Sequence, residues 1–446
     1  MEYTRSVTTY RGDCTFGAAE QMNQATHFLD GSHIYGANGR DAAALRETSG
    51  GLLKTSTVEG EVRLSKVAKP METCLVGSDE DACFLAGDAR ANANPWLAGV
   101  HTLFAMEHNR IARSLAVLNP SWSSDKLYHE ARRIVVATLQ HITYKQWLPA
   151  LTGKSFDELY DSYDTGYNSD VDPSVTNAFA TAAFHFTHSM LDQDVALTDD
   201  QLATTFLRLN DSFFNPNLLM EKQGLVKLLR GMVIQKAQDL DLNYDDDVRH
   251  RWLGGLDALA FDIQRGRDHG LPPYTHYRTL CGLQAASSFQ QLADDIPQEV
   301  IDKLSKIYES AADVDLVVGL MAETPLPGSL LGPTATCLFK EQMWRTRVGD
   351  RYFYEHSSEA GGAPRRQTAE LRKASLAALL CHNTDIGSVQ RDVFRVPSES
   401  NPIVSCDKIK RINLEAWQDS QSPDILTRTT KWLRGNRAGN TENVTK

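Results

Sequence analysis

The 446-residue sequence lacks the run of about 18 or more apolar residues that a membrane-spanning helix requires. It also lacks a basic excess, because 46 Lys and Arg stand against 57 Asp and Glu, giving a formal net charge of −11. Nucleic-acid binding depends on Lys and Arg contacts to phosphate, so this balance argues against a general nucleic-acid-binding protein. The composition is typical of an acidic globular protein that does not cross a membrane.

Cysteine is also scarce. The seven cysteines form no C-x-x-C pair, which argues against a zinc ribbon or a dithiol redox motif. On count alone, free thiols and a few disulfides are both compatible with the sequence. Two sequons, at Asn210 and Asn443, are compatible with a secreted glycoprotein. The first residues, MEYTRSVTTY, lack the apolar core of a signal peptide, so disulfides would imply that the chain is part of a longer secreted protein.

The remaining sequence has mostly helical periodicity. Apolar residues recur on one face over 100–118 and again over 127–142. Further helices are expected over 174–191, 222–238, 248–265, 297–311, 335–346 and 366–381. There is no internal repeat and no long alternating strand pattern. We therefore predict a mainly α fold with little β structure, comprising one large domain over 1–425 and a polar tail over 426–446.

The segment AFHFTHSML (183–191) places His185 and His188 three residues apart. Packed or surface histidines are the commonest explanation of this spacing taken alone. A zinc site would need further ligands, which the neighbouring sequence does not supply. A haem iron needs only one axial imidazole on an otherwise apolar helix, and the segment provides that.

The segment LAFDIQRGRDHGLPPY (259–274) concentrates charge in a stretch rich in turn-forming residues. Surface ion pairs are the usual meaning of such spacing. Asp262, however, is flanked by Phe261 and Ile263, and a carboxylate in apolar surroundings needs a hydrogen-bond partner. Arg265, one turn further on, is expected to supply its counter-charge.

Two other segments carry candidate ligands. In FLAGDARANANPW (84–96), Asp88 and Arg90 precede a predicted helix, where a salt bridge is the ordinary expectation. In ATHFLDGSHIYG (25–36), Thr26, Asp30 and Ser32 offer alternating oxygens. Hard oxygen ligands suit Ca²⁺, although composition alone equally favours a simple turn.

Together these segments resemble the animal haem peroxidase family, in the same order and over about residues 13–420. The resemblance rests on FLAGDAR (84–90), HTLFAMEHNRIA (101–112), LYHEARRIVVATLQHITYKQWLP (127–149) and IQRGRDHGLPPY (263–274). Of these, RGRDHG with its flanks is the most specific. The resemblance implies a haem peroxidase fold and a reaction in which H₂O₂ is reduced and organic donors are oxidised.

The resemblance assigns roles to individual residues. His188 is similar to the proximal haem ligand, Arg90 to the distal arginine and Arg265 to a partner of a haem propionate. The implied calcium ligands are Thr26, the carbonyl of Phe28, Asp30 and Ser32. The implied disulfides join Cys74 to Cys83, Cys281 to the cysteine adjoining Leu338, and Cys381 to Cys406; Cys14 is left without a partner. The family's distal histidine and a further calcium-binding aspartate would lie upstream of the calcium loop, and no histidine precedes His27.

Three departures from the family pattern affect the expected cofactor chemistry. Asp262 replaces an asparagine beside the proximal imidazole, and His185 replaces an arginine. Ala93 and Asn94 stand where other members have glutamate and methionine bonded covalently to the haem. We therefore expect non-covalent haem b and a Ca²⁺ ion in a secreted parent protein.

Two classes of function remain open. The first is a peroxidase that uses H₂O₂ to oxidise small phenols or protein tyrosines, with no nucleic-acid partner. The second is a non-catalytic haem-binding or adhesive homologue. A histidine flanked by aspartates upstream of Met1 would favour the enzyme.

Overall fold

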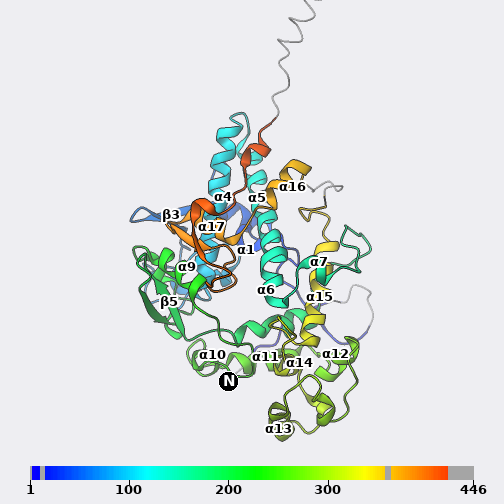
Figure 1. Cartoon of the computed structure of the whole chain (residues 1–446). Helices are drawn as coiled ribbons and strands as arrows, with labels where there is room; N and C mark the ends of the chain where they lie inside the picture. Colours follow the sequence, from blue (N-terminus) through cyan, green and yellow to red (C-terminus); the bar gives the residue numbers. More distant parts are fainter. Residues whose placement is uncertain (1–2, 11–15, 357–362, 420–446) are drawn as a thin grey trace, which may run out of the picture.

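The computed structural model describes residues 3–10, 16–356 and 363–419 (Figure 1). Within this part, the chain is mainly helical and its strands form four two-stranded antiparallel sheets, which confirms the predicted fold class. The predicted tail over 426–446, Asn443 and Cys14 lie outside the described residues.

The longer α-helices are α4 (Pro95–Leu118), α5 (Ser124–Ile142), α9 (Gly224–Ile234), α11 (Ala258–Asp268), α13 (Gln298–Ile307) and α15 (Pro333–Val348). The shorter ones are α1 (Ser32–Tyr35), α2 (Gly39–Leu45), α3 (Pro70–Thr73), α6 (Leu148–Thr152), α7 (Phe156–Leu159), α8 (Asn177–Thr181), α10 (Asp246–Arg249), α12 (Tyr274–Leu280), α14 (Leu316–Ala322), α16 (Arg365–Leu371) and α17 (Leu376–Asn383). The paired strands are β1 (Thr8–Thr9) with β2 (Glu20–Gln21), β3 (Thr55–Val58) with β4 (Glu61–Leu64), β5 (Asp194–Thr198) with β6 (Thr204–Arg208), and β7 (Ser388–Gln390) with β8 (Ile403–Ser405).

Helices α4 and α5 lie side by side and form the centre of the core (Figure 1). Helix α4 begins at Pro95, behind the side chain of Asn94, which accepts a hydrogen bond from the amide of Leu97. His108 of α4 is fully buried in this core. Its Nε2 donates to the carbonyl of Gly51 over 2.9 Å, so its Nδ1 accepts the 3.0 Å hydrogen bond from the hydroxyl of Tyr35.

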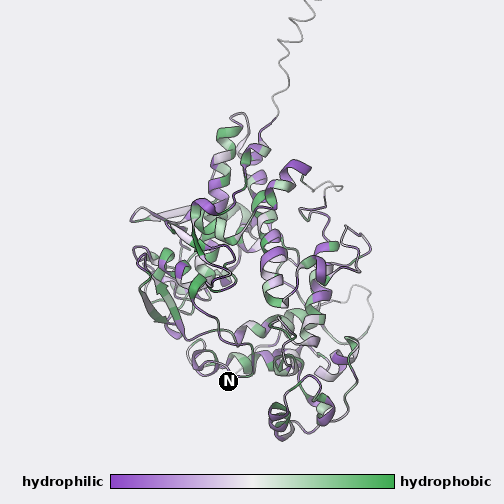
Figure 2. Ribbon diagram, viewed as in Figure 1, coloured by the Kyte–Doolittle hydropathy of each residue, from purple (hydrophilic) through white to green (hydrophobic). Residues whose placement is uncertain are grey.

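The hairpin of β5 and β6 packs beside α9, and both elements contain hydrophobic residues (Figure 2). Gly231 permits this close approach, because a Cβ at this position would overlap the backbone carbonyl of Ala196 in β5. The hairpin was not predicted, since each strand has only five residues and its pattern is too short to distinguish from a loop.

Three predicted helices are broken. The segment 248–265 is interrupted by Leu253, Gly254 and Gly255, which all have positive φ, and α11 starts only after the cap at Asp257. The segment 366–381 divides into α16 and α17 at the cap residue Ser375. The segment 174–191 divides into α8 and the 3₁₀ helix η3 (Ala183–His188).

The three disulfides implied by the family resemblance are present. Cys74 pairs with Cys83, Cys381 pairs with Cys406, and Cys281 pairs with Cys337, which adjoins Leu338. Among the described residues, no helix has both the length and the apolar character needed to cross a membrane.

Buried histidines give the fold a defined acid sensitivity. Burial lowers the pKa of His33, His108 and His141 to about 4, from an ordinary value of 6.5. Below about pH 6.5 the unfolded chain therefore binds protons that the folded chain takes up only near pH 4. These three histidines therefore lower the free energy of unfolding as the pH decreases through this window.

We expect the melting temperature to decrease between about pH 6.5 and pH 4, and His141→Gln to reduce the slope. Glutamine can still accept a hydrogen bond from Tyr354, which lies 2.6 Å from Nδ1 of His141, but it does not titrate. Thermal melts of both proteins across this range provide the measurement. An identical slope in the variant would contradict the assignment to buried histidines.

Candidate functional site

The two histidines of the HxxH segment lie on η3, a 3₁₀ helix rather than an α-helix. A 3₁₀ helix has three residues per turn, so side chains at i and i+3 are nearly eclipsed. His185 and His188 therefore share one face, with ring centroids 5.3 Å apart. Helix α8 begins after its N-cap residue Thr176. Ala182 ends α8 and precedes the first residue of η3.

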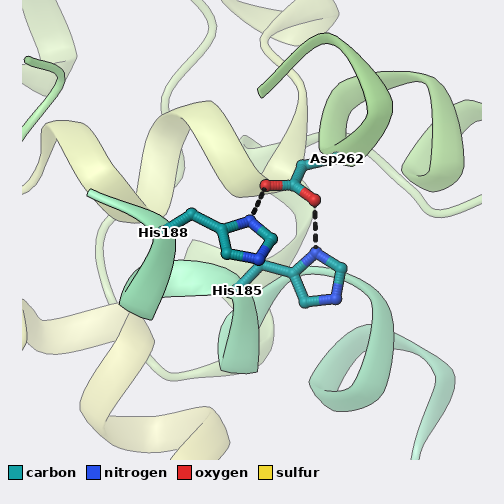
Figure 3. Close-up of side chains that lie close together, drawn as sticks. All are labelled: His185, His188 and Asp262. Atoms are coloured by element: carbon teal, nitrogen blue, oxygen red, sulfur yellow. Dashed lines mark hydrogen bonds and ion pairs between the residues drawn. The ribbon is translucent and has the colours of Figure 1, made fainter. Parts of the chain in front are cut away.

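Asp262 on α11 lies opposite these histidines and contacts both (Figure 3). Its Oδ1 is 2.7 Å from Nδ1 of His185, and its Oδ2 is 2.6 Å from Nδ1 of His188. Asp262 is 2% exposed. Three residues predicted for the site thus meet, although 74 residues or more separate each histidine from Asp262 in the sequence.

The protonation of this cluster follows from its hydrogen bonds. Burial raises the pKa of Asp262, but the hydrogen bonds from His185 and His188 outweigh it, so the pKa lies below that of an ordinary carboxyl. An ionised carboxylate only accepts, so both Nδ1 atoms donate to it. In neutral His188 this leaves Nε2 unprotonated and able to bind a metal.

Arg265 does not form the ion pair with Asp262 that the sequence predicted. Both carboxylate oxygens of Asp262 accept from the histidines, and the described residues contain no ion pair between Asp262 and Arg265. Nε of Arg265 is instead buried without a hydrogen-bond partner among the described residues. This nitrogen therefore keeps an unused hydrogen-bond donor that an anionic group could accept from.

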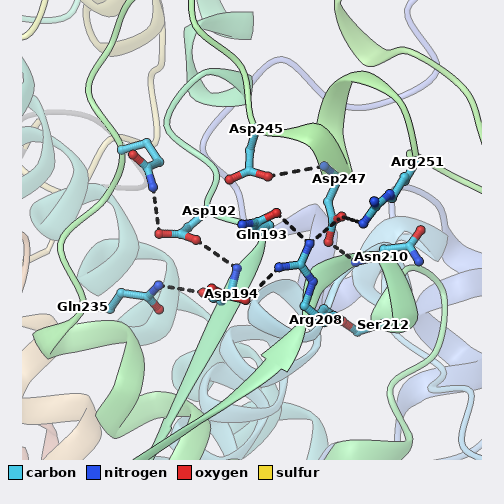
Figure 4. A network of polar contacts seen from close by, with 11 residues as sticks. Asp192, Gln193, Asp194, Arg208, Asn210, Ser212, Gln235, Asp245, Asp247 and Arg251 are labelled. Atoms are coloured by element: carbon cyan, nitrogen blue, oxygen red, sulfur yellow. Dashed lines mark hydrogen bonds and ion pairs between the residues drawn. The ribbon is translucent and has the colours of Figure 1, made fainter.

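A second network holds the segments around the cluster (Figure 4). At its centre is Asp247 of α10, which is fully buried. Its carboxylate accepts from Arg208 of β6 and from the amide of Asn210, both at 3.0 Å. Arg208 also binds Gln193 and Asp194, which follow η3. This network connects the chain leaving the histidines to the chain leading into α11.

Arg90 lies on the 3₁₀ helix η1 (Ala89–Asn92), just before α4, as predicted. Its Nε and Nη2 donate to the two carboxylate oxygens of Asp88, over 2.9 and 2.7 Å. This hydrogen bonding lowers the pKa of Asp88 to about 2, although partial burial opposes it. The side chain of Arg90 is 73% exposed, and no described histidine is within hydrogen-bond distance of it.

The predicted calcium loop has its oxygens turned toward one another. The hydroxyl of Thr26 is 2.9 Å from a carboxylate oxygen of Asp30 and 2.7 Å from the hydroxyl of Ser32. The amide of Ser32 also donates to Asp30. Phe28 lies half-buried in the same loop. Three predicted ligands therefore converge, and Ser32 begins helix α1.

Gly87 joins this loop to Arg90. A Cβ at Gly87 would overlap the carbonyl oxygen of Ser32 and the amide of Gly36, so only glycine lets the chain lie directly on α1. Gly87, three residues before Arg90, is thus in backbone contact with the predicted calcium loop at Ser32. Sequence reasoning missed this contact, because nothing in FLAGDAR identifies the partner of its glycine.

The end of the RGRDHG motif has a structural role that the sequence did not reveal. Asp268 accepts from Nε of Arg5 over 2.6 Å and from the amide of Ser6 over 2.9 Å. Nε2 of His269 lies 2.6 Å from the hydroxyl of Ser6, while its Nδ1 contacts Asn177 of α8. These contacts fasten the N-terminal segment to α11 and α8.

A cavity of 200 Å³ is lined by Trp96, two residues into α4, and by Met190, two residues after His188. The segment that follows Arg90 and the segment that follows His188 therefore line the same cavity. A larger cavity of 530 Å³ lies along α5, lined by His129, Arg132 and Trp417 among others. Neither cavity is lined by His185, His188 or Asp262, so we place the candidate site at the cluster itself.

We expect Gly87→Ala to destabilise the protein by about 1–3 kcal/mol, because overlap with backbone atoms cannot be relieved by a side-chain rotation. Gly77→Ala is the matched control, since a Cβ there meets only the carboxylate of Asp81, at 3.7 Å. Urea unfolding of the three proteins measures the difference. Equal stability of the Gly87→Ala variant and the parent would disprove the close contact with α1.

Comparison with known proteins places this geometry in context. The sequence model of the animal haem peroxidase family matches residues 1–394. The chain is 40% identical over 418 residues to the mouse peroxidasin homolog, covering 90% of this chain and 28% of that protein. It is 37% identical over 417 residues to mouse eosinophil peroxidase, covering 89% of this chain and 58% of that protein. The chain thus spans less than two thirds of either relative.

Solved structures agree. Peroxidase A from Dictyostelium discoideum superposes with a TM-score of 0.78 at 31% identity, covering 89% of this chain and 78% of that one. The fatty acid α-dioxygenase of Oryza sativa superposes with a TM-score of 0.63 at 20% identity, covering 80% of this chain and 63% of that one, which shows a shared fold only. On the extent of these matches, the chain belongs to the animal haem peroxidase family.

Proposed function

We propose that this chain binds haem b through His188 and forms the proximal half of a peroxidase site that uses H₂O₂ to oxidise organic donors. The observation that carries the proposal is the hydrogen bond from Nδ1 of His188 to the buried carboxylate of Asp262. It fixes the imidazole in the tautomer whose Nε2 is free for iron and makes that nitrogen more basic.

Other described residues fit the same cofactor. The buried, unpartnered Nε of Arg265 suits a haem propionate, which is an anion that accepts hydrogen bonds. Ala93 and Asn94 offer neither a carboxylate nor a thioether for a covalent link. The haem is therefore held without a covalent bond through these positions.

When bound, the haem supplies the redox chemistry that reduces H₂O₂ by two electrons and oxidises donors such as phenols or protein tyrosines. Arg90 contributes a fixed positive charge that stabilises the negative charge developing on the leaving oxygen of the peroxide. Asp88 accepts from two nitrogens of the guanidinium and so limits its orientation. Asp262 keeps the Nδ1 proton of His188 at a defined position throughout.

Calcium and secretion complete the proposal. Thr26, Asp30 and Ser32 provide converging oxygens, with the carbonyl of Phe28 as a further ligand, and such hard donors suit Ca²⁺. Only Asp30 carries a full charge, so we infer weak calcium binding. The three disulfides support an oxidising, extracellular location.

A haem-binding protein without peroxidase turnover is the second candidate. A peroxidase needs a base that moves a proton between the peroxide oxygens, and the Arg90 side chain is hydrogen-bonded to Asp88 and to no imidazole of the described residues. Reconstituting this chain with haem and assaying H₂O₂-dependent phenol oxidation separates the two candidates. A histidine-ligated Soret band with turnover supports the enzyme, whereas the same band without turnover supports the binding protein.

We expect His188→Ala to abolish the Soret band of a histidine-ligated haem after reconstitution, since the axial nitrogen is lost. His250→Ala provides the control, because His250 is exposed and far along the chain from η3. Absorption spectra of the two variants and the parent supply the measurement. A normal histidine-ligated spectrum in His188→Ala would show that another residue binds the iron.

We further expect Asp262→Asn to raise the Fe(III)/Fe(II) potential by tens of millivolts. A neutral amide accepts a weaker hydrogen bond than a carboxylate, so Nε2 donates less electron density and the ferric state is less favoured. Spectroelectrochemical titration at neutral pH compares the two proteins. An unchanged or lowered potential in the variant would mean that Asp262 does not act on the iron through His188.

A further inference from the structure

Two of the departures from the family pattern are in direct contact. His185, which replaces an arginine, and Asp262, which replaces an asparagine, are hydrogen-bonded over 2.7 Å. With His188 they form a cluster in which one donor atom from each side chain lies within 4.8 Å of the other two. The paired changes convert an arginine and an amide, neither of which readily binds metal ions, into an imidazole and a carboxylate, which do.

The donor set of this cluster is two imidazole nitrogens and one carboxylate oxygen. This set suits a divalent transition-metal ion, and zinc in particular binds His and Asp and leaves a fourth position for water. The side chains of His185 and His188 are 19% and 30% exposed, so an ion can reach them. The side chain of Asp262 is buried, at 3% exposure. We propose that in the haem-free chain His185, His188 and Asp262 bind a divalent metal ion, with zinc as the preferred ion.

The orientation of the rings identifies the ligand atoms. Both Nδ1 atoms face the carboxylate in Figure 3, at 2.7 and 2.6 Å. An ion inserted here replaces two N–H···O hydrogen bonds with two metal–nitrogen bonds and one metal–oxygen bond. Each neutral imidazole then carries its proton on Nε2 instead of Nδ1, so no net proton release is required.

This change of tautomer makes the ion and haem alternatives at His188. Haem iron requires an unprotonated Nε2 and keeps the proton on Nδ1, whereas the divalent ion requires an unprotonated Nδ1 and keeps the proton on Nε2. A neutral imidazole has one proton and one free nitrogen, so both could bind together only if His188 lost that proton and became a bridging imidazolate; we therefore expect them to compete. This competition rests on the proposed role of His188 in haem binding, but the binding of the ion does not.

Isothermal titration of the haem-free chain with zinc chloride, after removal of metals by a chelator, tests the proposal. We expect one ion per chain, with binding at least ~10-fold weaker in His185→Asn, since even residues that only support a metal ligand contribute ~10–100-fold to affinity. Asparagine retains a donor for Asp262 but removes the imidazole. His250→Ala, which removes an exposed histidine elsewhere, is expected to bind zinc like the parent.

Two further measurements keep the outcomes distinct. Circular dichroism and melting temperature without zinc establish that His185→Asn is folded, and Asp262→Asn serves as a second ligand variant if it is not. Reconstitution with haem should remove zinc binding in the parent.

Zinc affinity that is unchanged in both ligand variants, or the absence of zinc binding, would overturn the proposal. Equal zinc affinity of the haem-loaded and haem-free chains would overturn the expected competition. If zinc binding requires both histidines and no haem is taken up, the metal site stands and the proposed peroxidase function fails.

Discussion

The candidate site depends on the hydrogen bonds that the buried carboxylate of Asp262 accepts from His185 and His188. A charged carboxylate removed from water is strongly destabilising unless hydrogen bonds replace its hydration. Here the replacement comes from two imidazoles on one 3₁₀ turn, at 2.7 and 2.6 Å. The same two contacts fix the tautomer of both histidines, so stability and cofactor chemistry have a common origin. Either histidine, if lost, leaves one carboxylate oxygen buried without its partner.

The rest of the described structure keeps η3 and α11 at the spacing this carboxylate needs. Asp247 and Arg208 fasten the chain that leaves η3 to the chain that enters α11 (Figure 4). Asp268 and His269 fasten the other end of α11 to the N-terminal segment and to α8. Elsewhere, Gly87 fixes the Arg90 segment against α1. Polar contacts between distant segments thus hold η3 and α11 in place.

The periodicity of apolar residues predicted the elements whose formation depends on neighbouring residues, chiefly the long helices. The apolar faces of α4 and α5 were predicted, because long amphipathic helices show their period clearly. The interruption after α10 was missed, although Gly254 and Gly255 mark it, and the short β5–β6 hairpin left no readable pattern. The roles of His188, Arg90 and the calcium loop came from family resemblance and remain predictions.

Contacts between distant segments were beyond the reach of sequence reasoning. Arg265 was expected to neutralise Asp262, because it lies one turn away on the same helix. The carboxylate instead accepts a hydrogen bond from His185, which is 77 positions upstream in the sequence. The separate departures at His185 and Asp262 gave no sign that the two side chains touch. The hydrogen bond from Arg5 to Asp268 could not be predicted for the same reason, because the two residues are 263 positions apart in the sequence.

The central claim of the proposed function is that the carboxylate of Asp262 makes Nε2 of His188 a more basic ligand when iron is bound. Resonance Raman spectroscopy of the reduced, haem-reconstituted protein measures the iron–histidine stretching frequency, which rises as the axial nitrogen becomes more basic and its bond to iron stronger. The account predicts a higher frequency in the parent than in Asp262→Asn, with the exposed-site variant His250→Ala matching the parent. Equal frequencies in the parent and Asp262→Asn would contradict it.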